Sequence, residues 1–226
     1  AYQISVVYSS LLIKHVDNLF RLWLPNPIGL VFLYFIGFYI LLLVVKVDQR
    51  LSIAGAAAFA LSSYFFIILE AGHNTKAHAI GYMAPVLAGI ILSFRGKYIL
   101  GGVLTALFLS LEIYANHVQI TYYLMLVVLI LGISEFISKY KEKQLKTFFR
   151  AILVMGAALI IALGTNITNL WSTYEYGKYS TRGKSELTTD AEVKTSGLDR
   201  DYATDWSYGK WETLTLLIPD FMGGGS

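Results

Sequence analysis

The sequence runs LSIAGAAAFALSSYFFIILE from Leu51 to Glu70, makes a short polar turn, and continues HAIGYMAPVLAGIILSF from His78 to Phe94. Both segments are apolar over nearly their whole length. A helix of about 20 apolar residues can cross the hydrocarbon core of a bilayer, which is about 30 Å thick. A spanning segment of this length must be helical, because lipid cannot satisfy free backbone groups. The stretch therefore predicts two transmembrane helices joined by a polar turn.

Apolar segments of similar length recur along the chain. The sequence is 56% hydrophobic and only 15% charged, whereas soluble domains average about 25% charged residues. It contains no Cys, which excludes disulfides, thiolate catalysis and Cys-based zinc sites within this chain. We predict an all-α membrane protein with about six transmembrane helices. The predicted segments are residues 27–46, 51–70, 78–94, 98–114, 120–136 and 151–170.

Basic residues are distributed unevenly between the connections of these segments. If all of them span, one side carries most of the Lys and Arg, and the short turns on the other side carry only Lys76. Loops rich in Lys and Arg stay in the cytoplasm. We therefore expect residues 1–26, the turns at 70–78 and 116–119, and the tail from residue 165 to face outward. The cytoplasmic set is Lys46, Arg50, Arg95, Lys97, Lys139, Lys141, Lys143, Lys146 and Arg150.

The pattern divides the chain into three regions. Residues 27–170 are the predicted transmembrane domain, and residues 171–226 are predicted to be an extracytoplasmic loop region. Residues 1–26 are predicted to form an amphipathic helix that lies on the outer surface of the membrane. The apolar face expected for it, from helical spacing, comprises Leu11, Leu12, His15, Val16, Leu19 and Leu22. Because the chain begins without Met and stops soon after an apolar run, we interpret it as a fragment of a longer protein.

The turn at 70–78 gathers groups that can do chemistry: Glu70, His73, Asn74, Lys76 and His78. Ionisable groups cost about 2.5–3.5 kcal/mol each at membrane depth, so they mark a functional site by default. Gly72 is expected to end the preceding helix and to leave these residues in a tight turn. They could act as acid–base groups or bind an anion. The alternative is a solvated turn in which Glu70 pairs with Lys76.

A second polar group lies at the next outward turn. Glu112 is expected about one helical turn inside the end of its segment, on the same face as Asn116, with His117 beyond. A buried carboxylate needs a partner or stays protonated. His117, Lys76 or His73 could supply that partner if the two turns meet in space. The alternative is a structural hydrogen bond between helices.

The spacing of Glu70 and His73 also fits the Glu-x-x-His pattern of di-iron bundles. Those sites need a second such pair, and the spacing of Glu112 and His117 misses the pattern. We therefore expect no certain cofactor, with a divalent metal as an open alternative. No nucleic-acid partner is expected.

Several stretches of the chain form a recognisable set. The most specific is HNTKAHAIGYMAPVLAGI at 73–90, followed by FRGK at 94–97. The others are AYQIS at 1–5, ANHVQITYY at 115–123, and WSYG followed by ET and LIPDF between residues 206 and 221. Together they resemble the YfhO-type family of bacterial multispanning membrane proteins, in particular its Bacteroidetes-type members. The resemblance covers essentially the whole chain.

This resemblance implies a GT-C-type glycosyltransferase in the bacterial inner (cytoplasmic) membrane. GT-C enzymes transfer sugar from a polyprenyl-phosphate-linked donor on the outer face, and relatives add sugars to cell-envelope polymers. Their key acidic residue lies in a first outer loop, which would fall upstream of Ala1. Roles in this chain are therefore inferred from chemistry alone. We expect Glu70, His73 and Glu112 to be catalytic, and the donor to be bound by Asn74, Lys76, His78, Asn116 and His117.

Aromatic residues near the end of the chain have two interpretations. Trp206, Tyr208 and Trp211 could stack on sugar rings or anchor the chain at the membrane interface. Two other classes of function also stay open: a transporter or flippase for a lipid-linked sugar, and a non-catalytic subunit of a larger membrane assembly. A transporter should carry polar residues through the bilayer midplane. Here the polar residues crowd the outer end. Membrane lipids are expected partners in each case.

Overall fold

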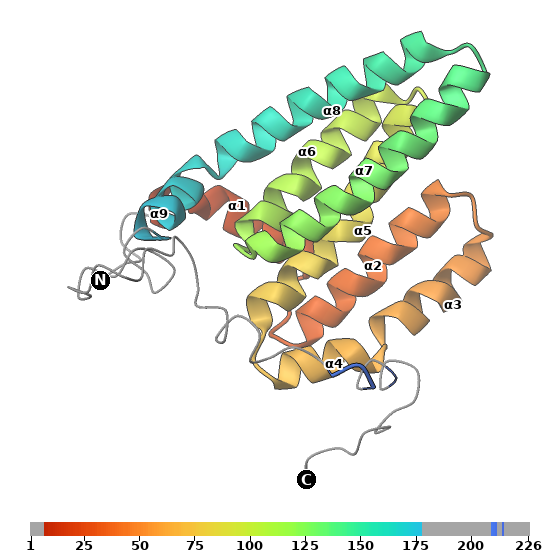
Figure 1. Ribbon diagram of the computed structural model, residues 1–226. Coiled ribbons are helices and arrows are strands. Elements are labelled where there is room, and N and C mark those ends of the chain that lie inside the picture. The colour runs from red at the N-terminus through yellow and green to blue at the C-terminus, as the bar shows by residue number, and fades with distance from the viewer. Residues whose placement is uncertain (1–6, 178–208, 212–213, 215–226) are drawn as a thin grey trace. The chain divides into compact units, whose positions relative to one another are not determined.

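The computed structural model describes residues 7–177, 209–211 and 214, and all regular structure in these residues is helical (Figure 1). The chain divides into two compact units, Ala1–Leu170 and Trp171–Ser226. The helix α9 (Ile167–Gly177) crosses this boundary. The helices of the first unit are α1 (Val7–Phe20), α2 (Ile28–Val44), α3 (Gln49–Ala60), α4 (Ser63–Glu70), α5 (Asn74–Phe94), α6 (Tyr98–Tyr114), α7 (Val118–Lys141) and α8 (Leu145–Thr165).

The first unit is an all-α membrane domain, as predicted. Within the described residues, four stretches are long and apolar enough to span a bilayer: Gln49–Glu70, Asn74–Phe94, Val118–Lys141 and Leu145–Thr165. The apolar helices α2 and α6 have 17 residues each. At 1.5 Å per residue such a helix is about 25 Å long, near the lower limit for crossing.

The predicted span at 51–70 is interrupted. Helix α3 ends at Ala60, and α4 begins only at Ser63. The residues at the break include Ser62 and Ser63, and Ser side chains favour caps and turns over helix interiors because they compete for backbone hydrogen bonds. The sequence pattern thus predicted the length of the segment correctly but not its division into two helices.

The helix after the polar turn begins earlier than expected. Asn74, Lys76 and His78 lie within the first two turns of α5, not in a tight turn. The chain turns between α4 and α5 at Gly72. Its φ of 75° lies in the left-handed region that glycine adopts without strain. The prediction that Gly72 ends the preceding helix is correct.

Helix α5 is the centre of the unit. In the most apolar stretch of α5, 72% of the residues are buried, against 11% in the corresponding stretch of α7. It approaches α6 closely because small residues face each other there: a Cβ added to Gly101 would lie 2.4 Å from Ser93 Oγ and 2.6 Å from the Gly89 carbonyl oxygen. Packing through small residues is how helices associate in lipid.

The connections segregate to two ends of the first unit. Figure 1 shows the connections α2–α3, α5–α6 and α7–α8 toward one end, and α4–α5 and α6–α7 toward the other. At the first end the Arg95 guanidinium donates a hydrogen bond to the Val44 carbonyl, joining the ends of α5 and α2. We call this the basic end, because the basic set named above lies there. We call the opposite one the polar end.

Helix α1 packs on the bundle through Ile13, Val16 and Phe20, which contact the core. The Phe20 ring lies 4.9 Å from Phe108 of α6. Val16 belongs to the predicted apolar face, and Leu12, Leu19 and Leu22 of that face are exposed at 77%, 51% and 51%. That these leucines lie on the outer surface of the membrane stays a prediction. The helix has apolar residues on more than one side, and spacing alone did not show which side meets the bundle.

Candidate functional site

The connection between α4 and α5 is held by backbone hydrogen bonds. The His73 N–H donates to the Ile68 carbonyl at 2.9 Å, and the Gly72 N–H donates to the Leu69 carbonyl at 3.0 Å. This pair of bonds is the Schellman arrangement, which satisfies the last carbonyls of a helix around a glycine. It leaves the Glu70 and His73 side chains exposed at the polar end.

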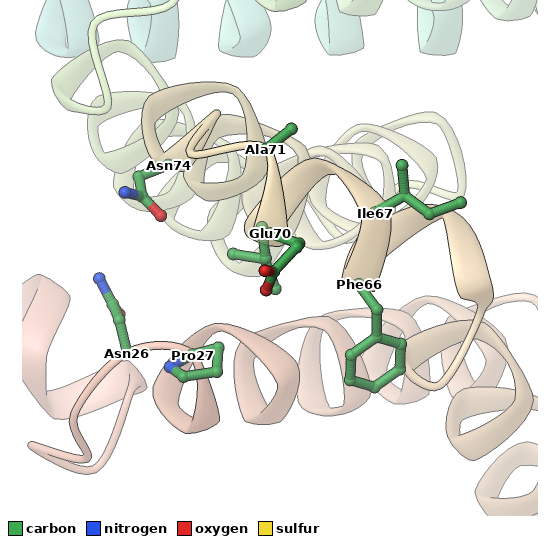
Figure 2. A pocket seen from close by; sticks show the side chains of 8 residues that line it. Asn26, Pro27, Phe66, Ile67, Glu70, Ala71 and Asn74 are labelled. Atoms are coloured by element: carbon green, nitrogen blue, oxygen red, sulfur yellow. The ribbon is translucent and has the colours of Figure 1, made fainter. Parts of the chain in front are cut away.

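Glu70 lines an open pocket of about 820 Å³. Figure 2 shows its carboxylate pointing toward Pro27 at the start of α2, with Asn26 and Asn74 to one side. The remaining lining is mostly apolar: Phe66, Ile67, Leu69 and Ala71. The described residues show no ion pair between Glu70 and Lys76. This pocket therefore offers one carboxylate and two amides against an apolar wall.

The two predicted polar turns meet. Thr75 Oγ1 lies 3.2 Å from His117 Nδ1, which joins the start of α5 to the start of α7. Partial burial lowers the pKa of His117, and the positive charges of Lys76 and His73 lower it further. These three groups therefore share one electrostatic environment. The turn at 70–78 and the turn at 116–119 form a single surface at the polar end.

Lys76 stands at one end of a groove. Its Nζ lies 5.5 Å from the centre of the Tyr64 ring, a distance at which the ammonium is attracted to the ring face. Lys76 and Gln119 also line a groove of about 550 Å³ whose other walls are mainly apolar. Those walls are Phe38, Leu41, Phe59, Tyr64, Phe65, Ile80, Met83, Ala84, Leu87, Ile120 and Tyr123.

A buried polar cluster lies beside this surface, and the sequence analysis missed its centre, Asp17. The Asp17 side chain is 1% exposed. Its Oδ1 accepts hydrogen bonds from His78 Nε2 and the Tyr82 hydroxyl, both at 2.5 Å. Its Oδ2 accepts from Arg21 Nη2 at 2.5 Å and Nε at 3.0 Å. The cluster joins α1 to α5.

The charge state of Asp17 follows from these partners. Burial raises the pKa of its carboxyl, but the hydrogen bond and charge of His78, together with Tyr82 and Arg21, outweigh burial and hold the pKa below its ordinary value. Arg21 also donates to Asn18 at 2.9 Å and to Asn26 at 3.2 Å. Asn26 in turn lines the Glu70 pocket. The cluster and that pocket are thus connected through Arg21.

A signal for Asp17 was present in the sequence. It lies at the spacing of Ile13, Val16 and Phe20, three residues that pack against the core. An acidic residue on the apolar face of an amphipathic helix must find partners, because a buried unpaired charge is too costly. The predicted face included only Val16 of these three residues, so Asp17 was not recognised as lying beside the core.

Glu112 is fully buried, as expected, and its recorded partner is on the neighbouring helix α7. Thr121 Oγ1 donates to both of its carboxyl oxygens, at 3.0 and 3.1 Å. Thr121 also lines an apolar cavity of about 560 Å³ between α5, α6, α7 and α8. The hydrogen bond joins α6 to α7, which was the structural alternative. No contact between Glu112 and His73, Lys76 or His117 is recorded in the described part of the chain.

The remaining predicted residues are Asn116, Trp206, Tyr208 and Trp211. Asn116 is exposed, with a φ of 55°, at the end of α6. Trp211 belongs to the second unit and is exposed. Trp206 and Tyr208 lie outside the described residues. Among the residues that are described, no three His, Cys, Asp or Glu side chains come close enough to hold a metal ion.

Comparisons with known proteins add nothing to this geometry. No protein-family model matches the chain. No curated protein matches it, and no solved structure matches it.

Proposed function

We propose that this protein is a membrane glycosyltransferase of the GT-C type, which transfers a sugar from a polyprenyl-phosphate-linked donor to a cell-envelope acceptor. The reaction would take place at the polar end, on the outer face of a bacterial inner (cytoplasmic) membrane. The orientation rests on the rule that basic connections stay in the cytoplasm. The reaction class is what the resemblance to YfhO-type proteins implies. The geometry of the polar end supports it through the groups that could bind the donor.

The observation that carries the proposal is the groove headed by Lys76. A polyprenyl phosphate is an amphiphile with one anionic group and a long apolar chain. The groove has a cation and an amide, from Lys76 and Gln119, among walls of aliphatic and aromatic side chains. The positive charge of Lys76 also acts on His117, so the groove carries a charge that an anion can meet. The groove matches the donor in charge and in apolar character.

The neighbouring Glu70 pocket suits the sugar. Carboxylates and amides are the groups that bind hydroxyls in mostly apolar pockets. Glu70, Asn74 and Asn26 provide them, and Phe66 provides an apolar face. Glu70 and His73 are exposed and free to reach a substrate. Glu112 is buried on Thr121 and in this proposal supports the helices instead of touching the donor.

Transfer of labelled sugar by the full-length protein tests the proposal. We expect incorporation from a polyprenyl-phosphate donor into an envelope acceptor, and at least tenfold lower activity for Glu70→Gln, His73→Ala and Lys76→Ala. Full activity in all three variants would show that the polar end is not the site.

A groove-filling variant tests the donor's chain separately. Leu87→Trp should raise the KM for a long-chain donor and leave the KM for a short-prenyl donor nearly unchanged, because only the long chain reaches Leu87. Ile130→Trp is the matched control, since Ile130 is 69% exposed on α7 and lines no groove named here. Equal effects on both donors would exclude the groove as the chain's binding site.

One observation favours a transporter as the second candidate. Broken helices near a polar site are typical of transporters, and the break between α3 and α4 lies in the segment that leads to Glu70. Uptake or flipping of a lipid-linked sugar by vesicles, without sugar transfer, would favour that function.

A further inference from the structure

The cluster around Asp17 contains a histidine whose protonation is defined by its partner. A carboxylate ionised in this environment has no proton to give, so the 2.5 Å contact requires His78 Nε2 to carry the hydrogen. In neutral His78 the other nitrogen, Nδ1, then has a free lone pair. Which ring nitrogen is protonated is set by the hydrogen bond that the other ring nitrogen makes.

The His78 ring is partly accessible: its side chain is 16% exposed, whereas Asp17 is 1% exposed. No hydrogen bond to Nδ1 is recorded in the described part of the chain. His78 lies one helical turn beyond Asn74, which lines the Glu70 pocket, and Arg21 connects Asp17 to Asn26 of the same pocket. The pair is therefore linked to the pocket assigned to the sugar through Asn74 and Arg21.

We propose that His78 is the general base that deprotonates the acceptor hydroxyl, and that Asp17 is its positioning residue. This inference rests on the proposed function. Carboxylate–imidazole pairs in which the acid fixes tautomer and orientation recur in enzymes of unrelated folds. Here the acid is held by donors on both of its oxygens and the imidazole is partly open, which is the arrangement such a pair needs.

Proton transfer to His78 accompanies the transfer of the sugar. His78 Nδ1 takes the proton of the acceptor hydroxyl while that oxygen bonds to the anomeric carbon of the sugar. The bond between the anomeric carbon and the phosphate oxygen breaks, and its electron pair leaves with the polyprenyl phosphate. The imidazolium is stabilised by the Asp17 carboxylate until it releases the proton to solvent.

The charged and titratable groups around the pair come from the end of α1, from α5 and from α6. Arg21, one residue beyond α1, balances the charge of Asp17, and Tyr82 of α5 donates to the same oxygen as His78. Tyr114 of α6 lies within electrostatic range of Asp17 and Arg21.

A conservative variant of His78 separates its catalytic role from its role in holding α1 on the bundle. Gln at position 78 can still donate a hydrogen bond to Asp17, so α1 stays attached, but it has no basic nitrogen. For the full-length protein we expect His78→Gln to lower kcat by about 10²–10⁴-fold, with KM and thermal stability near wild type. The acid limb of the pH–rate profile should disappear. His15→Gln, at an exposed histidine on α1, should keep the wild-type rate.

Asp17→Asn tests the positioning role. It should lower kcat, because the imidazole loses the carboxylate that holds its tautomer and orientation. Nitrogen-15 NMR of labelled histidine should show His78 protonated at Nε2 in the wild type and a mixture of tautomers in Asp17→Asn.

The outcomes separate this inference from the function on which it rests. Wild-type transfer with an unchanged rate and pH profile in His78→Gln would overturn the role of His78 and leave the glycosyltransferase standing. Absence of transfer in the wild type would overturn both. A wild-type His78 protonated at Nδ1 would overturn the inference whatever the transfer assay gives.

Discussion

At the scale of single residues, the polar end depends on charges that the protein holds out of water. Asp17 has donors on both carboxyl oxygens: Arg21, one residue beyond the end of α1, and His78 and Tyr82 of α5. An ion pair taken out of water stabilises the protein only when such extra hydrogen bonds complete it. Position 17 is therefore sensitive to substitution in a way that its neighbours are not.

Asp17→Ala should lower the free energy of unfolding by about 3–5 kcal/mol, because it leaves Arg21 and the donors of α5 without their acceptor. Thermal unfolding of the full-length protein in detergent measures this. His15→Gln on the exposed side of α1 should leave the midpoint unchanged. Equal midpoints for Asp17→Ala and wild type would mean that the cluster does not hold α1 on the bundle.

His117 should titrate below the usual range of histidine, because partial burial and the charges of Lys76 and His73 disfavour its protonated form. Below about pH 6.5 the unfolded chain then takes up this proton more readily than the folded one. Stability from this group is therefore present above that pH and is lost as the pH falls.

Lys76→Gln should raise the pKa of His117 by removing one of these charges, and NMR titration of labelled histidine measures it. Lys146→Gln, at the basic end, should leave the titration where it was. A pKa of His117 that does not respond to Lys76→Gln would show that the two turns do not share a surface.

For single residues, the sequence predicted burial but not the hydrogen-bond partner. Glu112 was expected to be buried from its apolar neighbours, and it is. Its partner Thr121 could not be chosen in advance, because the choice depends on the rotation of α6 against α7. The meeting of the two polar turns was expected only as a consequence of topology, and the contact of Thr75 with His117 required coordinates.

At the scale of helices, the closest contact in the domain is α5 against α6. Gly89, Ser93, Gly101 and Thr105 let the two backbones approach, and a Cβ at Gly89 would lie 2.6 Å from Thr105 Oγ1. The sequence alone could not identify these partner residues, since many small residues occur in these segments.

Gly101→Ala should destabilise the protein by about 1–3 kcal/mol, because the added methyl group has no room without a shift of α5. Gly132→Ala is the matched control: a Cβ there meets nothing within 4 Å, so that variant should be neutral or slightly more stable. Comparing the two midpoints by thermal unfolding decides the matter. Equal losses would argue against close packing at Gly101.

Helix ends were harder to predict than helix existence. Each predicted segment contains an apolar helical stretch, four of them long enough to span a bilayer, but α5 begins at Asn74, ahead of the predicted start at residue 78. Polar residues in a first helical turn look like loop residues in a hydropathy pattern. This shift matters, because it distributes Asn74, Thr75 and His78 around a helix, toward three different partners.

At the scale of the whole molecule, polarity along the bundle distinguishes its two ends. The basic residues lie at one end and the candidate site at the other, which predicts that residue 74 is outside the cell and residue 143 inside. Asn74→Cys should react with a membrane-impermeant maleimide in intact spheroplasts, and Lys143→Cys only after permeabilisation. The chain has no Cys of its own.

Ala56→Cys is the matched control for this labelling, because Ala56 is fully buried and should not react in either condition. Labelling of position 143 and not of position 74 in intact spheroplasts would reverse the orientation. The site would then face the cytoplasm.

The measurement that tests the central claim most directly is side-specific sugar transfer. The full-length protein would be placed in sealed proteoliposomes of known orientation, with a labelled polyprenyl-phosphate sugar and acceptor supplied to one face at a time. We predict transfer when the substrates reach the polar end, and loss of that transfer in Lys76→Ala. No transfer from either face, or transfer only at the basic end, would contradict the proposal.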